Sequence, residues 1–318
     1  MAEILLETKN LKKYFKCGKK QYLHAVDDIT ISIEKGKTLG VVGESGCGKT
    51  TLGRTILGLI PSTSGEIYFE GEKISGLRNS QMKKYRSEMQ IIFQDPYSSI
   101  NPRHRIGKII GEPLLVNKIE TNSKKRKESV LALMKRVGLA ENLYDKYPHE
   151  LDGGRRQRIG VARALSVNPK LIICDEPVSA LDVSIQAQIL NLLMDLQEEE
   201  NFTYIFITHD LSVVKHISDE IVVMYLGQCV EKTTSDELFE NPLHPYTKAL
   251  LSAILVPSAT IRDSEIEIIE GEITSPVDPK PGCRFAARCP FATDECTKDN
   301  IPLKEITPGH FVSCIKIK

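Results

Sequence analysis

Apolar and polar residues alternate along residues 25–36 and 65–71, which predicts two strands with one buried face. Three further segments, 38–43, 170–177 and 203–210, contain short runs that are almost wholly apolar, as is typical of strands buried on both faces. The amphipathic stretch 187–200 lies between the last two and predicts a helix. A strand, a helix and a strand in that order indicate a parallel α/β architecture.

The pattern changes to a helical one from about residue 96 to residue 166. Within it, Val130, Leu131, Met134 and Val137 fall on one face of a helix. We therefore expect a helical subdomain at 96–166, inserted into an α/β core formed by 1–95 and 167–240. Proline and glycine in 241–251 and 274–282 mark the start of a separate C-terminal extension, 241–318.

Charge and composition restrict the class of protein. The 318 residues include 42 basic and 42 acidic side chains, so no overall field attracts nucleic acid, and we expect no nucleic-acid partner. No run approaches the roughly 18 apolar residues of a membrane-spanning helix, and the first residues do not resemble a signal peptide. These features predict a cytosolic location, where disulfides are rare.

Residues 43–50, GESGCGKT, match the phosphate-loop motif, and they follow a buried strand and open a helix. Glycines allow such a loop to fold into a nest of N–H groups around nucleotide phosphates. Lys49 would reach the outer phosphates, and the Thr50 hydroxyl would bind Mg²⁺. The alternative is a glycine-rich turn, which the strand–loop–helix context argues against. The residues expected around the phosphates are Gly43, Ser45, Gly46, Cys47, Gly48, Lys49, Thr50 and Thr51.

A pair of carboxylates, Asp175 and Glu176, ends the apolar run of 171–174. The carboxyl ends of strands are where α/β sheets bind ligands. We expect Asp175 to hold the Mg²⁺ shell and Glu176 to orient and polarise the attacking water. The plainer alternative for Glu176 is a carboxylate at the start of a helix.

Five segments, 43–51, 91–96, 151–165, 171–182 and 206–210, resemble in order and spacing the motif blocks of an ATP-binding cassette (ABC) subunit. The resemblance covers roughly residues 5–240. The sequence segments 94–103, 175–188 and 241–251 resemble the dipeptide/oligopeptide importer group in particular. It implies a P-loop NTPase (RecA-like) core with an antiparallel β subdomain, an inserted helical subdomain and a small Cys-rich C-terminal extension.

The resemblance also implies roles for single residues. Gln94 resembles the loop glutamine that contacts Mg²⁺, which would then be bound by Thr50, Gln94 and Asp175. His209 resembles the switch histidine that hydrogen-bonds the γ-phosphate, although a strand-end histidine bonded to backbone is the plainer alternative. The loop 179–182 resembles the one that crosses the dimer interface, and Phe15 or its neighbour Tyr14 resembles the aromatic that stacks on adenine.

Family members form face-to-face dimers in which each ATP lies between one phosphate loop and the partner's signature helix. The usual signature is Leu-Ser-Gly-Gly-Gln, but here Asp152 and Arg155 flank Gly153 and Gly154. A carboxylate about 4 Å from a phosphate charge costs about 1–4 kcal/mol, more than the roughly 1 kcal/mol of a lost hydrogen bond. Arg155 can soften this repulsion, and Asp is as good a helix N-cap as Ser. We expect an intact fold and a weakened composite site.

The resemblance predicts an ATP-hydrolysing subunit that powers import of di- and oligopeptides from the cytoplasmic face of the membrane. The implied partners are a second cassette subunit, in a heterodimer or alternatively a homodimer, two transmembrane permease subunits and, indirectly, an extracytoplasmic solute-binding protein. One alternative is a soluble ABC ATPase of translation or DNA repair, although the chain has neither a second cassette nor a coiled-coil insertion. Another is a weakly hydrolysing regulatory subunit, which only the altered signature supports.

Four of the eight cysteines gather near the C-terminus: Cys283, Cys289, Cys296 and Cys314. Their spacing matches neither the usual zinc pairs nor ferredoxin-type runs. Clustered thiols in a reducing compartment nevertheless favour a metal site, and four thiolates suit iron–sulfur or zinc. The resemblance favours a structural [4Fe–4S] cluster, with Zn²⁺ or free thiols as alternatives.

Overall fold

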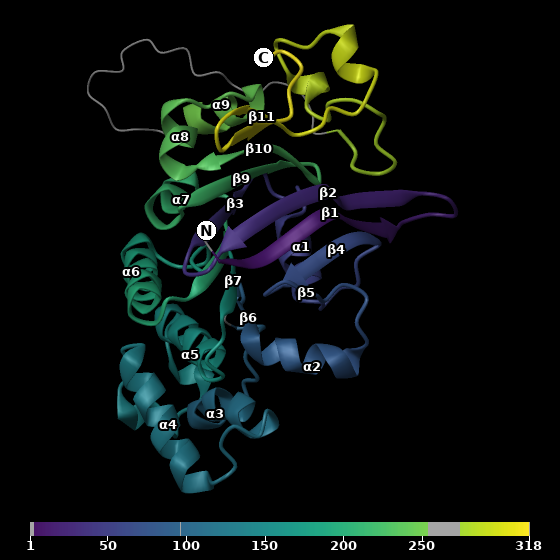
Figure 1. Ribbon diagram of the computed structural model, residues 1–318. Helices are drawn as coiled ribbons and strands as arrows, with labels where there is room; N and C mark the ends of the chain where they lie inside the picture. The colour runs from purple at the N-terminus through teal and green to yellow at the C-terminus, as the bar shows by residue number, and fades with distance from the viewer. Residues whose placement is uncertain (1–2, 96, 254–273, 318) are drawn as a thin grey trace, which may run out of the picture.

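The computed structural model describes residues 3–95, 97–253 and 274–317 (Figure 1). Within them the strands form two sheets, of which the smaller is antiparallel with strand order β2–β1–β4–β5. Long alternating patterns account for its strands, because one face packs inward and the other meets solvent. The bounds are β1 Ile4–Lys16, β2 Tyr22–Glu34, β4 Ser64–Phe69 and β5 Glu72–Lys73.

The larger sheet has the strand order β11–β12–β10–β9–β3–β8–β7–β6. Its five strands from β9 to β6 are parallel, which confirms the predicted α/β architecture, while β10, β12 and β11 add antiparallel strands at one edge. The bounds are β3 Thr38–Val42, β6 Met89–Ile92, β7 Leu171–Asp175, β8 Thr203–Ile207, β9 Glu220–Tyr225, β10 Gln228–Thr234, β11 Lys304–Thr307 and β12 His310–Val312.

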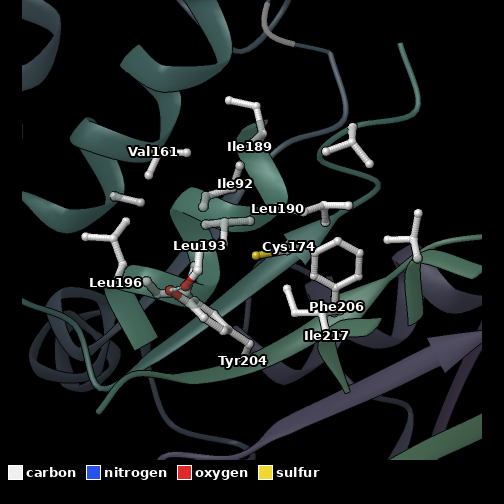
Figure 2. Packing of buried hydrophobic residues seen from close by; sticks show 14 of the residues in the cluster. Ile92, Val161, Cys174, Ile189, Leu190, Leu193, Leu196, Tyr204, Phe206 and Ile217 are labelled. Atoms are coloured by element: carbon white, nitrogen blue, oxygen red, sulfur yellow. Dashed lines mark hydrogen bonds between the residues drawn. The ribbon is translucent and has the colours of Figure 1, made fainter. Parts of the chain in front are cut away.

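Helices cover both faces of the larger sheet. Helix α1, Lys49–Ile56, packs between the two sheets, and α6, Val183–Glu200, covers the opposite face of the larger one. Figure 2 shows the core on the α6 side, where Leu190 and Leu193 pack towards Cys174 and Phe206. The core also contains α2 Asn79–Glu88, α7 Leu211–Ile217 and α8 Ser235–Glu240, and α9 Pro245–Ser252 follows at the start of the expected extension.

Residues 97–165 form the helical segment that the sequence predicts, at the lower end of the molecule in Figure 1. Val130, Met134 and Val137 are fully buried and Leu131 is partly so, which confirms the predicted apolar face of the helix at α4. Pro96, the first residue of the expected segment, lies outside the described residues. The elements are α3 Ile106–Val116, α4 Ser123–Arg136, α5 Gly153–Leu165 and the 3₁₀ turns Glu141–Leu143 and Pro148–Glu150.

The C-terminal residues 274–317 pack against the core at the opposite end of the molecule (Figure 1). They contain the 3₁₀ turns Ala286–Arg288 and Asp294–Thr297, and their strand β12 pairs with β10. Part of the expected extension, residues 254–273, lies outside the described residues. The described helices are each too short or too polar to span a membrane.

Candidate nucleotide-binding site

The phosphate loop joins the end of β3 to the start of α1. Gly43, Gly46 and Gly48 have φ angles of 147°, 79° and 106°, a region of backbone space that L side chains rarely adopt. A Cβ at Gly43 would lie 2.1 Å from the Met224 carbonyl oxygen, and one at Gly48 would lie 1.9 Å from that of Ala25. The loop therefore needs glycine both for its curvature and for its close packing.

Lys49 lies inside this loop with its ammonium group turned back over the backbone. The residue is 5% exposed, and its Nζ donates to the carbonyl oxygens of Gly43 and Glu44 at 2.7 and 3.0 Å. Its third contact is the Cys47 sulfur at 3.8 Å, a weak acceptor that a phosphate oxygen would replace. Ser45 and Gly46 are exposed at the loop tip, and Thr51 follows in the first turn of α1.

Of the three residues predicted to bind Mg²⁺, Thr50 and Asp175 are in direct contact, whereas Gln94 contacts Glu176 and Ser179. The Thr50 hydroxyl donates to Asp175 Oδ1 at 2.7 Å, and Arg54 Nη2 lies 3.9 Å from Asp175 Oδ2. Asp175 is 2% exposed, and this burial raises the pKa of its carboxyl group. A hydroxyl and a carboxylate fit Mg²⁺, which prefers hard oxygen ligands and completes its shell with water and substrate phosphates.

The Glu176 carboxylate contacts two other predicted site residues, Gln94 and His209. Gln94 Nε2 donates to Glu176 Oε2 at 2.9 Å, and His209 Nδ1 lies 3.3 Å from the same oxygen. Gln94 also reaches the Ser179 hydroxyl at 3.4 Å. Glu176 has a φ of +48°, and its N–H donates to the Ile207 carbonyl of β8, which fixes the turn that presents the side chain.

These side chains meet because β6, β7 and β8 are parallel and end at the same edge of the sheet. Gln94 follows β6, Glu176 follows β7 and His209 follows β8, although Gln94 and His209 lie 115 positions apart in the sequence. The exposed fractions of the side chains are 15% for Glu176 and 58% for His209. The site is thus open to solvent, with the carboxylate partly sheltered.

The altered signature stands at the start of α5, where Asp152 caps the helix as expected. Its Oδ1 accepts the Arg155 N–H at 2.8 Å, and Arg155 Nε lies 3.5 Å from its Oδ2. Both side chains are more than half exposed. Gly154 packs so closely against α6 that a Cβ would lie 2.6 Å from Ile185 Cγ2. Gly153 faces Leu181, which belongs to the expected interface loop 179–182.

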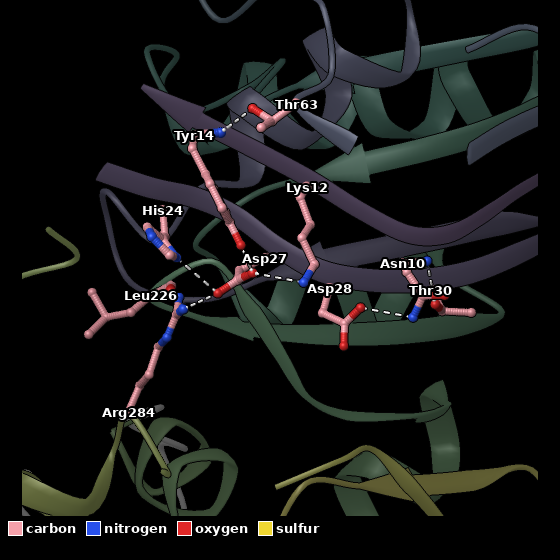
Figure 3. Close-up of polar contacts among 10 residues, drawn as sticks. All are labelled: Asn10, Lys12, Tyr14, His24, Asp27, Asp28, Thr30, Thr63, Leu226 and Arg284. Atoms are coloured by element: carbon pink, nitrogen blue, oxygen red, sulfur yellow. Dashed lines mark hydrogen bonds and ion pairs between the residues drawn. The ribbon is translucent and has the colours of Figure 1, made fainter. Parts of the chain in front are cut away.

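The two candidates for the adenine-stacking aromatic, Tyr14 and Phe15, have different surroundings. Tyr14 already stacks on His24, with ring centroids 3.8 Å apart, and its hydroxyl donates to Asp27 (Figure 3). Phe15 is 37% exposed, and Lys13 Nζ lies 4.7 Å from its ring centroid. Phe15 therefore has an exposed ring, whereas the ring of Tyr14 is engaged.

Sequence reasoning missed a contact to the phosphate loop from the far end of the chain. Arg288 Nη1 and Nη2 donate to the two carboxylate oxygens of Glu44, at 2.8 and 3.1 Å. The Tyr246 hydroxyl accepts the Glu44 N–H at 2.9 Å. The sequence did contain one indication of this contact. Glu44 places a carboxylate in the predicted phosphate loop, and such a charge favours a cationic neighbour.

Residues 26–179 match the family described as "ABC transporter", and residues 230–296 match "Oligopeptide/dipeptide transporter, C-terminal region". The chain is 50% identical to the oligopeptide transport ATP-binding protein OppF of Escherichia coli (strain K12), over 99% of this chain and 97% of that protein. The chain belongs to the ATP-binding subunits of ABC transporters.

Other relatives of this ABC ATPase belong to the same family. It is 48% identical to the dipeptide transport ATP-binding protein DppF of Haemophilus influenzae, over 98% of this chain and 97% of that protein. The dimeric ATP-binding cassette MJ0796, solved in a post-hydrolysis state with ADP and Pi, is similar with a TM-score of 0.66 and 28% identity, over 73% of this chain and 99% of that one. These relatives support the transport interpretation rather than an ATPase of translation or DNA repair.

The predicted metal site of this ABC ATPase is wrong. Cys283, Cys289, Cys296 and Cys314 line one small cavity, but in the described part of the chain no group of three or more His, Cys, Asp or Glu side chains is placed to hold a metal ion. Burial raises the pKa of Cys283 to about 11 and raises that of Cys289. The structure thus supports neither the [4Fe–4S] cluster nor Zn²⁺, since closeness in sequence did not produce a coordinating arrangement.

Proposed function

We propose that this ABC ATPase powers the import of di- and oligopeptides. In this proposal it binds the cytoplasmic face of the membrane through two transmembrane permease subunits, works with a second cassette subunit and depends indirectly on an extracytoplasmic solute-binding protein. The names of the relatives support the peptide class of solute. The observation that carries the ATPase part is the meeting of Thr50, Asp175, Gln94, Glu176 and His209 at one sheet edge.

In the proposed site, Phe15 stacks on adenine, and backbone N–H groups of the phosphate loop, that of Glu44 excepted, surround the phosphates. Thr50, Asp175 and Gln94 would hold Mg²⁺, which would neutralise charge on the phosphates. Glu176 accepts a hydrogen bond from the attacking water and draws the proton from it. His209 turns from Glu176 towards the γ-phosphate, and Gln94 relays the state of the site to the permeases.

We also propose the domain division 1–95 and 167–240 for the ATP-binding core, 96–166 for the helical signature subdomain and 241–318 for the C-terminal extension. The placement of α3 to α5 supports the second unit. The extension is not an isolated module, because β12 pairs with β10 and residues 283 and 289 pack on the main core.

The signature residues 152–155 contribute to the partner's nucleotide site. The Asp152 carboxylate lowers the affinity of that composite site for the γ-phosphate, and Arg155 offsets part of the repulsion. This chain's own loop, Glu176 and His209 are complete. A heterodimer with a partner whose signature is intact would therefore retain one effective site, which favours the heterodimer over a homodimer with two weakened sites.

The test is Glu176→Gln in the assembled transporter. We expect phosphate release and uptake of labelled tripeptide to fall about 100-fold or more, because a general base contributes about 10² to 10⁴ in rate. MgATP binding should persist, because Gln keeps the shape of the side chain. A variant that still hydrolyses ATP would show that Glu176 does not activate water. Normal hydrolysis without peptide uptake by the unsubstituted transporter would show that the solute is another compound.

A further inference from the structure

Arg288, in the C-terminal residues 274–317, reaches the phosphate loop. Arg288 ends the 3₁₀ turn Ala286–Arg288, and its guanidinium forms two parallel hydrogen bonds with the Glu44 carboxylate at 2.8 and 3.1 Å. The side chains are 8% and 23% exposed, respectively. Paired bonds of this geometry are among the strongest that a carboxylate makes, and partial burial limits their screening by salt.

Glu44 is fixed at each of its polar groups. Its N–H donates to the Tyr246 hydroxyl of α9, and its carbonyl oxygen accepts from Lys49 Nζ at 3.0 Å and from the Cys47 N–H at 3.2 Å. Its carboxylate is held by Arg288. The second residue of the loop is thus joined to the loop lysine, to α9 and to the C-terminal segment at once.

The Arg288 side chain is itself held in place. Phe285, one turn earlier, is 1% exposed and packs against Tyr225 and Tyr246 with ring centroids 5.3 Å away in each case. Arg288 Nη1 also lies 3.3 Å from the Tyr225 hydroxyl. Little side-chain entropy is left to lose when the pair with Glu44 forms.

A second arginine fastens the other side of the same segment. Arg284 donates to the Leu226 carbonyl oxygen and to Asp27, the carboxylate that also receives the Tyr14 hydroxyl (Figure 3). These two partners of Arg284 lie on β2 and in the turn after β9, whereas the partners of Arg288 include the phosphate-loop residue Glu44. This division leaves Arg288 as the residue whose role is specific to the loop.

The charge of Glu44 explains why the loop needs this partner. A loop that receives a polyphosphate gains from N–H groups and cations, and an unpaired carboxylate in it would repel the ligand. We propose that Arg288 is a positioning residue for nucleotide binding, which neutralises the Glu44 carboxylate and holds it away from the phosphates. This inference rests on the proposed role of residues 43–51 in binding ATP.

The experiment is a double-mutant cycle on the purified full chain, with the dissociation constant for MgATP as its readout. Arg288→Ala should weaken binding about fivefold to tenfold, because it leaves Glu44 unpaired beside the ligand. Glu44→Gln should bind as well as the unsubstituted chain or better. The double variant Glu44→Gln/Arg288→Ala should regain most of the lost affinity. The matched control is Lys298→Ala, which removes an exposed cation from the same segment and should change nothing.

Other results would overturn either the role of Arg288 or the proposed function. If the double variant binds as weakly as Arg288→Ala, Arg288 acts by its own charge or by folding, and the inference is overturned. Unchanged affinity of Arg288→Ala would overturn it as well. Thermal unfolding of Arg288→Ala without nucleotide distinguishes a folding defect from a loss of nucleotide affinity. Glu44→Gln would not repair a folding defect. Failure of the unsubstituted chain to bind MgATP would refute the proposed function itself.

Discussion

Asp152 places a carboxylate where a serine is usual in the family that the sequence resembles, yet the helix that it opens is regular. The reason is that either side chain can accept the N–H of the residue three positions later, as Asp152 does from Arg155 at 2.8 Å. The fold and the composite site therefore respond to this residue through different interactions, and a substitution can separate them.

Asp152→Ser should raise steady-state ATP hydrolysis by the chain without its partner subunit several-fold. The variant removes the repulsive charge, leaves the Arg155 cation and keeps a capping oxygen, so its free energy of unfolding should change by less than about 0.5 kcal/mol. Phosphate release at several protein concentrations and urea unfolding measure the two effects. Asp152→Asn is the control, because it caps equally well without the charge. Equal rates for all three chains would contradict a repulsive role for Asp152.

At the scale of elements, local sequence patterns predicted the strands and helices that pack against segments near them in the sequence or whose faces are uniformly buried. The strands β3, β7 and β8 could be recognised because both faces are buried, and the phosphate loop because its motif is continuous. Glu176 and His209 lie close together because the parallel strands that precede them end at the same edge of the sheet. The carboxylate of Glu44 could indicate a cationic neighbour, but not that this neighbour is Arg288, because the two lie 244 positions apart in the sequence and no pattern links them. The four cysteines misled because spacing without a known template does not define geometry.

Helix α9 carries a titratable cap whose effect on stability can be measured. His244 is 1% exposed, its Nδ1 accepts the Tyr246 N–H at 3.1 Å, and burial lowers its pKa from 6.5 to about 4. The unfolded chain therefore binds the proton more tightly than the folded one. The stabilisation is complete above pH 6.5 and is lost as the pH falls through 4, an effect of about 3 kcal/mol.

His244→Asn should flatten this part of the pH profile. Asparagine can cap α9 in the same way but does not titrate. The variant therefore loses some packing at every pH, and its free energy of unfolding falls less between pH 6.5 and 4 than that of the unsubstituted chain. Urea unfolding of both chains across this range gives the difference. Profiles that run parallel from neutral to acidic pH would show that His244 is not protonated on unfolding.

At the scale of the whole molecule, the complete and the altered parts of the site belong to different composite sites of the proposed dimer. The loop, Glu176 and His209 would act on the ATP bound by this chain, whereas 152–155 would face the ATP bound by its partner. Because the signature of this chain carries the repulsive carboxylate, the two sites of a heterodimer should contribute unequally to turnover.

This asymmetry predicts which catalytic carboxylate matters more. Glu176→Gln in this chain should remove most of the ATP hydrolysis of the heterodimer, because it disables the site closed by an intact partner signature. The equivalent substitution in the partner subunit should remove only a small part, because it disables a site that Asp152 already weakens. Phosphate release by the two singly substituted heterodimers measures the difference, and adding Asp152→Ser should make the two losses more nearly equal. Equal losses without that addition would mean that both composite sites turn over alike despite the carboxylate.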